Sequence, residues 1–248
     1  GHSVSEADLM PGLEQAIANA PARVVVACFA SNIARLQTIG DLAHSSGRHL
    51  AVLGRSLNDM IASAKVCGYL QENFNVVPAH DIGYLPPHEV LIIATGSQGE
   101  SAAALNRLAQ GTHPELELEP YDRVIFSSKT IPGNELAIEQ LVSALRSRKV
   151  EVIDHSNTQL PIHASGHPCV EELAQMYRWV DSSLAIPVHG EPQHLRANAE
   201  VAKQCGIAQR LLGENGDLFR IRPTPGIYRS AVRTGRLELL SNGQLQPV

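Results

Sequence analysis

Short apolar runs rich in β-branched residues alternate with longer segments of helical periodicity through most of this 248-residue chain. Such runs, bounded by Gly, Pro, Ser and Asn, predict strands buried on both faces, and the segments between them predict helices. The alternation is typical of an α/β domain in which helices cover both sides of a parallel sheet. The expected strands are residues 23–28, 49–53, 89–94, 123–127 and 150–154, and the expected helices between them are 32–44, 57–67, 101–109 and 134–147.

A second part of the chain is expected beyond a polar turn at residues 155–159. Apolar residues recur at helical spacing in two further segments, and three short apolar runs near the end alternate with glycine-containing turns. This pattern predicts two helices followed by the edge strands of a sandwich. The predicted helices are residues 168–180 and 192–205, and the predicted strands are 218–221, 227–232 and 237–240.

Composition narrows the kinds of partner. Hydrophobic residues make up 44% of the chain, which is ample for a core, and no apolar run approaches the roughly 20 residues that span a bilayer. We therefore expect a cytoplasmic protein with no membrane partner. The formal net charge of −5 argues against a broad basic surface for nucleic acid, so an RNA substrate would be held locally in a cleft.

Two histidines follow predicted strand ends on either side of helix 168–180. They lie in the motifs Ser165-Gly166-His167 and Pro187-Val188-His189-Gly190-Glu191, 22 positions apart (189 − 167). A strand, helix, strand unit brings both strand exits to one edge of a sheet, which is where open α/β folds gather their functional groups. We expect the two imidazoles to converge there.

Five stretches in a fixed order carry a family resemblance. They are residues 1–6 (GHSVSE), 28–32 (CFASN), 94–100 (ATGSQGE), 127–135 (SSKTIPGNE) and the two histidine motifs. Their content and order resemble the ribonuclease J family, in the β-CASP branch of the metallo-β-lactamase fold. The resemblance implies a parallel-sheet β-CASP domain followed by the C-terminal portion of a metallo-β-lactamase αββα domain.

The resemblance also implies a domain division. Residues 1–7 would end an N-terminal metallo-β-lactamase half, residues 8–155 would form the β-CASP domain, and residues 156–248 would return to the metallo-β-lactamase domain. The family's His-x-His-x-Asp-His metal cluster does not occur in this sequence. We therefore expect the C-terminal part of the catalytic region only, beginning just after the strand that carries the bridging aspartate.

The implied chemistry is zinc-dependent hydrolysis of RNA phosphodiesters, as a 5′–3′ exoribonuclease in RNA maturation and decay, with endonuclease activity left open. By resemblance, His189 is a ligand of one of two zinc ions, His167 is a catalytic residue that meets the scissile phosphate, and Glu6 is its acidic partner. From the residues alone, His189 could instead cap a strand end, and Glu6 could cap a first helical turn after Ser3 or Ser5.

Glycine and serine residues at several strand-to-helix turns are candidates for binding phosphate. Backbone amides can approach an anion closely at glycine, and a helix start supplies free N–H groups and partial positive charge. Ordinary helix capping explains each serine separately, with Ser31 a natural cap. By resemblance, a 5′-phosphate pocket would include Ser97 and Ser165. The candidate RNA- and phosphate-binding residues are Gly96, Ser97, Gly99, Ser165, His163, Ser31 and Ser128.

Two alternatives stay open at this stage. The chain could be a catalytically incomplete RNA- or phosphate-binding or assembly module, because it offers one metal ligand where a zinc site needs about four. It could also be a doubly wound nucleotide-binding enzyme, although the turn after the first strand lacks the Gly-x-Gly-x-x-Gly pattern. The expected partner is RNA with a 5′ monophosphate, and assembly into a dimer or tetramer is left open.

Overall fold

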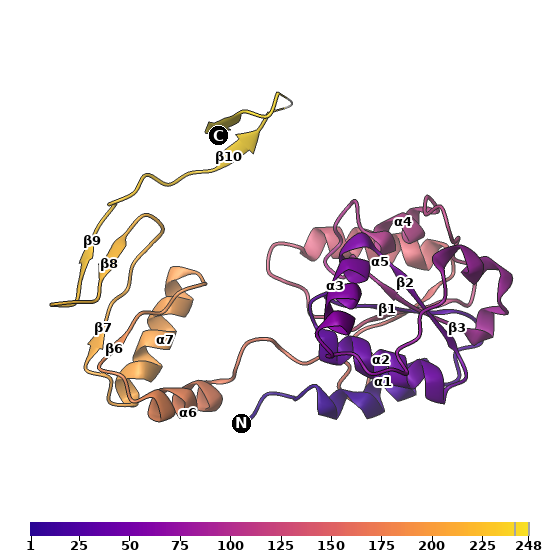
Figure 1. Ribbon diagram of the computed structural model, residues 1–248, viewed down its shortest axis with the longest axis horizontal. Helices are drawn as coiled ribbons and strands as arrows, with labels where there is room; N and C mark the ends of the chain where they lie inside the picture. The colour runs from indigo at the N-terminus through magenta and orange to yellow at the C-terminus, as the bar shows by residue number, and fades with distance from the viewer. Residues whose placement is uncertain (241, 248) are drawn as a thin grey trace. The chain divides into compact units, whose positions relative to one another are not determined.

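The computed structural model describes residues 1–240 and 242–247, which form two compact units (Figure 1). One unit is Val4–Gly166, and the other combines Gly1–Ser3 with His167–Val248. The predicted domain boundaries after residues 7 and 155 stay a prediction. Within the described ranges, no helix has the length and apolar character needed to cross a membrane.

The Val4–Gly166 unit is built on a five-stranded parallel sheet with strand order β2-β3-β1-β4-β5. The central strand β1 is buried along its whole length, as expected for an apolar run covered on both faces. The predicted parallel sheet is therefore confirmed. Its strands are β1 (Val24–Ala27), β2 (His49–Leu53), β3 (Val90–Ala94), β4 (Arg123–Phe126) and β5 (Glu151–Ile153).

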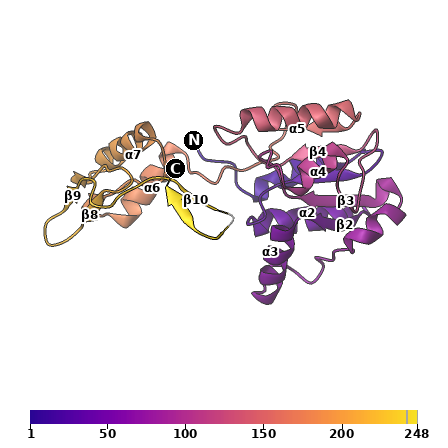
Figure 2. The same ribbon diagram turned by 90° about the horizontal axis from the view of Figure 1, so that it is seen from above.

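Helices cover both faces of this sheet (Figure 2). Successive side chains of a strand point to opposite faces, so Val24 and Val26 pack in the cluster that contains α1, α2 and α3, whereas Val25 and Ala27 pack against α4 and α5. The two clusters make the core continuous through the sheet. The helices are α1 (Met10–Ile17), α2 (Ile33–Ser45), α3 (Arg55–Val66), α4 (Ala104–Gln110) and α5 (Glu135–Ser147).

Helix α1 is the main element that the sequence pattern did not predict. Pro11 and Gly12 stand in its first turn, where proline is tolerated but glycine weakens the helical signal. The structure shows why glycine stands there, because a Cβ atom on Gly12 would lie 2.1 Å from the carbonyl oxygen of Pro161. The close approach of the backbone at Pro161 therefore requires glycine at position 12.

Smaller differences concern element ends. Helix α4 begins at Ala104, three residues later than expected, and the predicted loop 78–88 contains a 3₁₀ helix, η2 (Ala79–Tyr84). Two more 3₁₀ turns, η1 (Ala7–Leu9) and η3 (Pro87–Glu89), precede α1 and β3. Short 3₁₀ turns commonly connect regular elements and carry little periodicity of their own.

The unit that contains residues 167–248 has a small core. Ala185, Ala202 and Ile207 form its buried cluster, with Tyr177 packed against them. Both predicted helices are present, and the strands pair as one parallel ladder, β6–β7, and two antiparallel hairpins, β8–β9 and β10–β11. The elements are α6 (Val170–Val180), β6 (Leu184–Ala185), α7 (Pro192–Gln204), β7 (Gln209–Arg210), β8 (Leu218–Arg220), β9 (Gly226–Tyr228), β10 (Leu237–Leu239) and β11 (Leu245–Pro247).

Replacement of Gly12 by alanine tests the close approach to Pro161. We expect Gly12→Ala to lower the free energy of unfolding by about 1–3 kcal/mol, because the added methyl group forces two backbones apart. Gly83→Ala is the matched control, since a Cβ atom there meets nothing within 4 Å, and its effect should stay below about 1 kcal/mol. Urea unfolding of both variants measures the difference, and equal midpoints would contradict this account of α1.

Candidate functional site

A buried arginine organises the carboxyl edge of the sheet. Arg35, on the first turn of α2, is 1% exposed, and its guanidinium group pairs with both carboxylate oxygens of Glu6. The Nε–Oε2 and Nη2–Oε1 distances are both 2.8 Å, which is the bidentate geometry that makes arginine–carboxylate pairs strong. The remaining terminal nitrogen donates to the backbone oxygen and the hydroxyl of Ser127, at 2.8 and 2.6 Å.

Glu6 is held in its charged form by these contacts. Burial acts to raise its pKa, but hydrogen bonds from Arg35 and from the amide of Asn32, together with the charge of Arg35, outweigh burial and lower it. Glu6 makes no side-chain capping hydrogen bond; Ser5 instead donates to Asp8 through both its N–H and its hydroxyl. The helix-capping interpretation of Glu6 is therefore wrong.

Local structure at the start of α2 fixes the position of Arg35. The side-chain oxygen of Asn32 accepts a hydrogen bond from the backbone N–H of Arg35 at 3.1 Å, so Asn32 is the N-cap residue. Ser31 is not the cap that its residue type predicts, because it is exposed and precedes the cap. Its predicted contact with phosphate stays a prediction.

His163 lies beside the same network. Its Nδ1 atom is 3.3 Å from the backbone oxygen of Ser127, whose hydroxyl donates to the backbone oxygen of Ile162 at 2.6 Å. Burial lowers the pKa of His163, and the positive charge of Arg35 lowers it further. A neutral imidazole in this place can exchange hydrogen bonds with a ligand but offers no fixed positive charge to a phosphate.

Two strand-to-helix loops are joined at this edge by Gln98. Its amide nitrogen donates to the backbone oxygen of Lys129, and its amide oxygen accepts from the backbone N–H of Ile131, both at 2.9 Å. The loop that follows β3 therefore lies against the loop that follows β4. These loops carry the predicted phosphate-binding residues Ser97 and Ser128, which are 2% and 4% exposed.

Gly96 and Gly99 give the first of these loops its shape. Their φ angles are +110° and +77°, a region that side chains disfavour. A Cβ atom on Gly99 would lie 2.8 Å from the backbone carbon of Ala137 on α5. The glycines are thus required by backbone conformation and packing, and their predicted role in binding phosphate stays a prediction.

The two motif histidines meet in the unit that contains residues 167–248. The rings of His167 and His189 are stacked, with centroids 5.7 Å apart and planes inclined by 15°. The predicted convergence of the imidazoles is confirmed, but the strand expected to end before His167 is wrong, because residues 161–165 have no regular secondary structure. Glu6 and Ser165 belong to the other unit, so their predicted association with His167 stays a prediction.

His189 is presented on a left-handed turn, with φ of +65°. Histidine tolerates this region better than most residues, and such conformations concentrate at functional sites. His189 also lines a cavity of about 740 Å³ together with Glu214 and Asp217. The Asp217 carboxylate already accepts hydrogen bonds from the backbone N–H groups of Glu214 and Ser230 and pairs with Arg229, so its oxygen atoms are occupied.

The donor set around His189 decides how a metal ion could be held. Zinc sites in enzymes take at least three protein ligands. Across the described residues, no three His, Cys, Asp or Glu side chains are placed to hold a metal ion together. His189 can serve as one ligand, but these residues alone do not form a zinc site.

The Glu6–Arg35 pair makes a testable contribution to stability. We expect Glu6→Gln to lower the free energy of unfolding at pH 7 by about 1–3 kcal/mol, because Arg35 then loses its buried counter-charge while Glu6 itself is partly exposed. Because the pKa of Glu6 is lowered, this stabilisation is complete above the ordinary value of 4.5 and is lost as the pH falls through the folded-state pKa.

Urea unfolding at pH 7 and pH 3 provides the measurement. The gap between wild type and Glu6→Gln should narrow at pH 3, whereas Glu14→Gln, an exposed carboxylate on α1, should be close to wild type at both pH values. A gap of equal size at both pH values would rule out an ion pair as the source of the stabilisation.

Both parts of the chain are similar in sequence to known protein families. Residues 21–145 match the family described as "Ribonuclease J, beta-CASP domain", and residues 161–210 match "Zn-dependent metallo-hydrolase RNA specificity domain". The chain is 34% identical over 254 residues to Ribonuclease J of Sinorhizobium meliloti, covering 98% of the chain and 45% of that relative. It is 39% identical over 240 residues to Ribonuclease J of Mycolicibacterium smegmatis, covering 96% of the chain and 43% of the relative.

A third relative is similar over most of the chain. Ribonuclease J of Helicobacter pylori is 33% identical over 226 residues, covering 90% of the chain and 32% of that relative. The chain spans less than half the length of these three relatives. Since the first match covers four of the five strands of the parallel sheet, β1 to β4, and the relatives align with nearly all of the chain, the chain belongs to the ribonuclease J family, with a β-CASP domain of the metallo-β-lactamase superfamily in its Val4–Gly166 unit.

Proposed function

We propose that this chain is part of a zinc-dependent ribonuclease that hydrolyses RNA phosphodiesters in the cytoplasm during RNA maturation and decay. In this proposal the enzyme works from the 5′ end as an exonuclease, with endonuclease cleavage as a second mode. The observation that carries it is the stacked pair His167 and His189, which lies inside the segment similar to an RNA specificity domain.

His167 is proposed to meet the scissile phosphate and to supply a proton or hydrogen bond to the leaving oxygen. Such a histidine works best with a carboxylate that orients its ring and favours its protonated form. Glu6 is the proposed partner. Glu6 is charged at the neutral pH at which the reaction runs, as this role requires, and both of its oxygen atoms also accept hydrogen bonds from Arg35, which fix the orientation of the carboxylate.

His189 is proposed as a ligand to one of two zinc ions. Bound zinc supplies a Lewis acid for phosphate oxygens and makes an attacking hydroxide available near neutral pH. The left-handed turn at His189 and the following Gly190 support the proposal, because both residues line the cavity. The other ligands would come from residues beyond those that line this cavity.

RNA is proposed to bind through its phosphates along the carboxyl edge of the sheet, with a preference for a 5′ monophosphate. The tie between the two loops through Gln98 supports this, because it brings two serine-bearing strand exits together. The residues proposed to contact phosphate are Gly96, Ser97, Gly99, Ser128, Ser31, His163 and Ser165.

An alternative keeps RNA binding and removes catalysis from this chain. The chain would then serve as an RNA- or phosphate-binding or assembly module. Assembly into a dimer or tetramer is proposed for the full protein. Both proposals expect no cleavage when this chain alone is incubated with 5′-monophosphorylated RNA and zinc. Cleavage by the chain alone would contradict the expectation that further metal ligands are required.

Substitution of the two histidines tests the proposed roles. In the enzyme that contains this chain, we expect His167→Ala to lower the cleavage rate of 5′-monophosphorylated RNA by about 10²–10⁴-fold, the range typical of a lost general acid. His189→Ala should lower the rate at least as much and should also reduce the zinc bound per chain. RNA affinity should change little in either variant.

Rate, RNA affinity and zinc content are measured on the same preparations. His155→Ala is the matched control, since His155 is exposed on a turn and belongs to neither motif. Normal cleavage in either motif variant would refute the assignment of that histidine. Loss of RNA binding together with cleavage would point to the binding module instead.

A further inference from the structure

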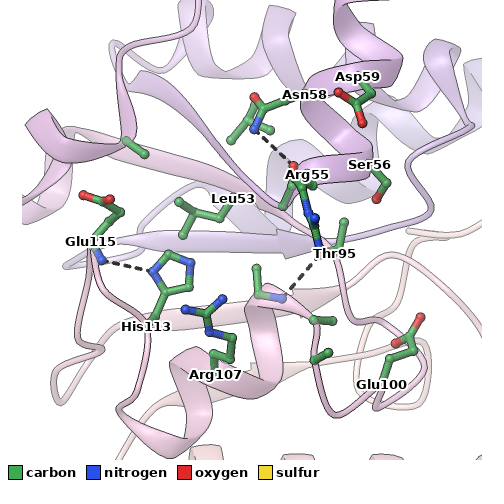
Figure 3. A pocket seen from close by; sticks show the side chains of 16 residues that line it. Leu53, Arg55, Ser56, Asn58, Asp59, Thr95, Glu100, Arg107, His113 and Glu115 are labelled. Atoms are coloured by element: carbon green, nitrogen blue, oxygen red, sulfur yellow. Dashed lines mark hydrogen bonds between the residues drawn. The ribbon is translucent and has the colours of Figure 1, made fainter. Parts of the chain in front are cut away.

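A second cavity lies at the carboxyl ends of β2 and β3, within the Val4–Gly166 unit (Figure 3). Its volume is about 720 Å³, within the range typical of sites for small molecules. None of the residues assigned above to RNA cleavage or phosphate binding lines it. The side chains and backbone groups that matter here come from Gly54, Arg55, Thr95, Arg107, His113 and Glu115.

The cavity exists because two strand exits approach each other closely. A Cβ atom on Gly54 would lie 2.6 Å from the hydroxyl oxygen of Thr95, and the φ angle of Gly54 is +135°. Gly54 is also the N-cap residue of α3 and offers no capping side chain. The first backbone N–H groups of this 12-residue helix are therefore left for another acceptor.

Two arginines add positive charge to this helix start. Figure 3 shows Arg55, Arg107 and His113 in the middle of the cavity. Across the part of the chain that the structure describes, neither arginine forms an ion pair, whereas Arg23, Arg35 and Arg123 each pair with a carboxylate. The guanidinium groups of Arg55 and Arg107 are thus available for an anion.

His113 is oriented as a hydrogen-bond donor. The backbone N–H of Glu115 donates to its Nδ1 atom at 3.3 Å, so the neutral ring carries its proton on Nε2. Burial first, and the charge of Arg107 second, lower the pKa of His113. A bound anion would offset the positive charge of Arg107 and favour the protonated ring, so binding is expected to change the signals of His113.

Three carboxylates also line the cavity and limit the charge of a ligand. Asp59, Glu100 and Glu115 lie toward its margins in Figure 3, and Glu100 already accepts a hydrogen bond from the backbone N–H of Gln98 at 3.0 Å. In dinucleotide-binding α/β folds, a carboxylate accepts a hydrogen bond from a ribose hydroxyl. A molecule with one phosphate and a ribose fits this distribution better than a polyphosphate does.

We propose that this cavity binds a nucleoside 5′-monophosphate, with its phosphate held by Arg55, Arg107 and the start of α3, and its ribose facing the marginal carboxylates. The phosphate and ribose could belong to a free mononucleotide or to the 5′-terminal residue of an RNA strand. The proposal concerns binding alone, so it stands or falls separately from RNA cleavage.

Titration of this chain, labelled at histidine for NMR, with adenosine 5′-monophosphate tests the proposal. We expect saturable binding that moves the His113 signals and raises the pKa of His113, with weaker binding of inorganic phosphate and of adenosine. Arg55→Gln and Arg107→Gln should each weaken binding of the nucleotide by about tenfold or more, since each removes a charge-assisted contact. Arg107→Lys should restore part of the affinity.

Arg146→Gln is the control, because Arg146 is an exposed arginine on α5 outside the cavity. A 5′-monophosphorylated RNA that binds more tightly than the free nucleotide, and still depends on Arg55, would identify the RNA end as the source of the phosphate. If His113 is unmoved by nucleotide, phosphate and RNA at millimolar concentration, or if both glutamine variants bind like wild type, the proposal is wrong. Unchanged unfolding midpoints show that the variants are folded.

Discussion

The buried guanidinium group of Arg35 holds the carboxyl edge of the sheet together. Transfer of such a charge out of water costs several kcal/mol, and the cost is offset only where the contacts are complete. Here Glu6 supplies the counter-charge, and Ser127 accepts two further hydrogen bonds. Since Ser127 in turn donates to Ile162, one arginine connects the first residues of the unit, α2, the exit of β4 and the segment that bears His163.

Most of the parallel sheet could be predicted from sequence, because strands covered on both faces leave continuous apolar runs. The central strand Val24–Ala27 is an example, since every residue in it must be buried. Helix α1 could not be predicted in the same way. Glycine is required at position 12 because of its contact with Pro161, about 150 positions away in the sequence. Nothing in the sequence near Gly12 indicates that contact.

The residues of the candidate site that lie in short sequence motifs could be predicted. The residues whose role depends on contacts with distant parts of the sequence were missed. The two histidine motifs led to the convergence of His167 and His189, which the stacked rings confirm. Arg35 was missed, because a charged residue near the start of a helix is usually solvated and its partner Glu6 is 29 positions away. Gln98 was missed for a similar reason, although its place between two glycines of a βα loop was a signal.

The Gln98 amide limits how this protein can be altered. Because the side chain joins the loops after β3 and β4, inserting residues into either loop would leave hydrogen-bonding groups of a nearly buried amide unsatisfied. The turn segment 46–47, which precedes β2, is exposed and lines neither of the two cavities described above, so it can accept added length at far lower cost. A fluorescent reporter or an affinity tag would therefore be placed in that segment, where it leaves the paired loops intact.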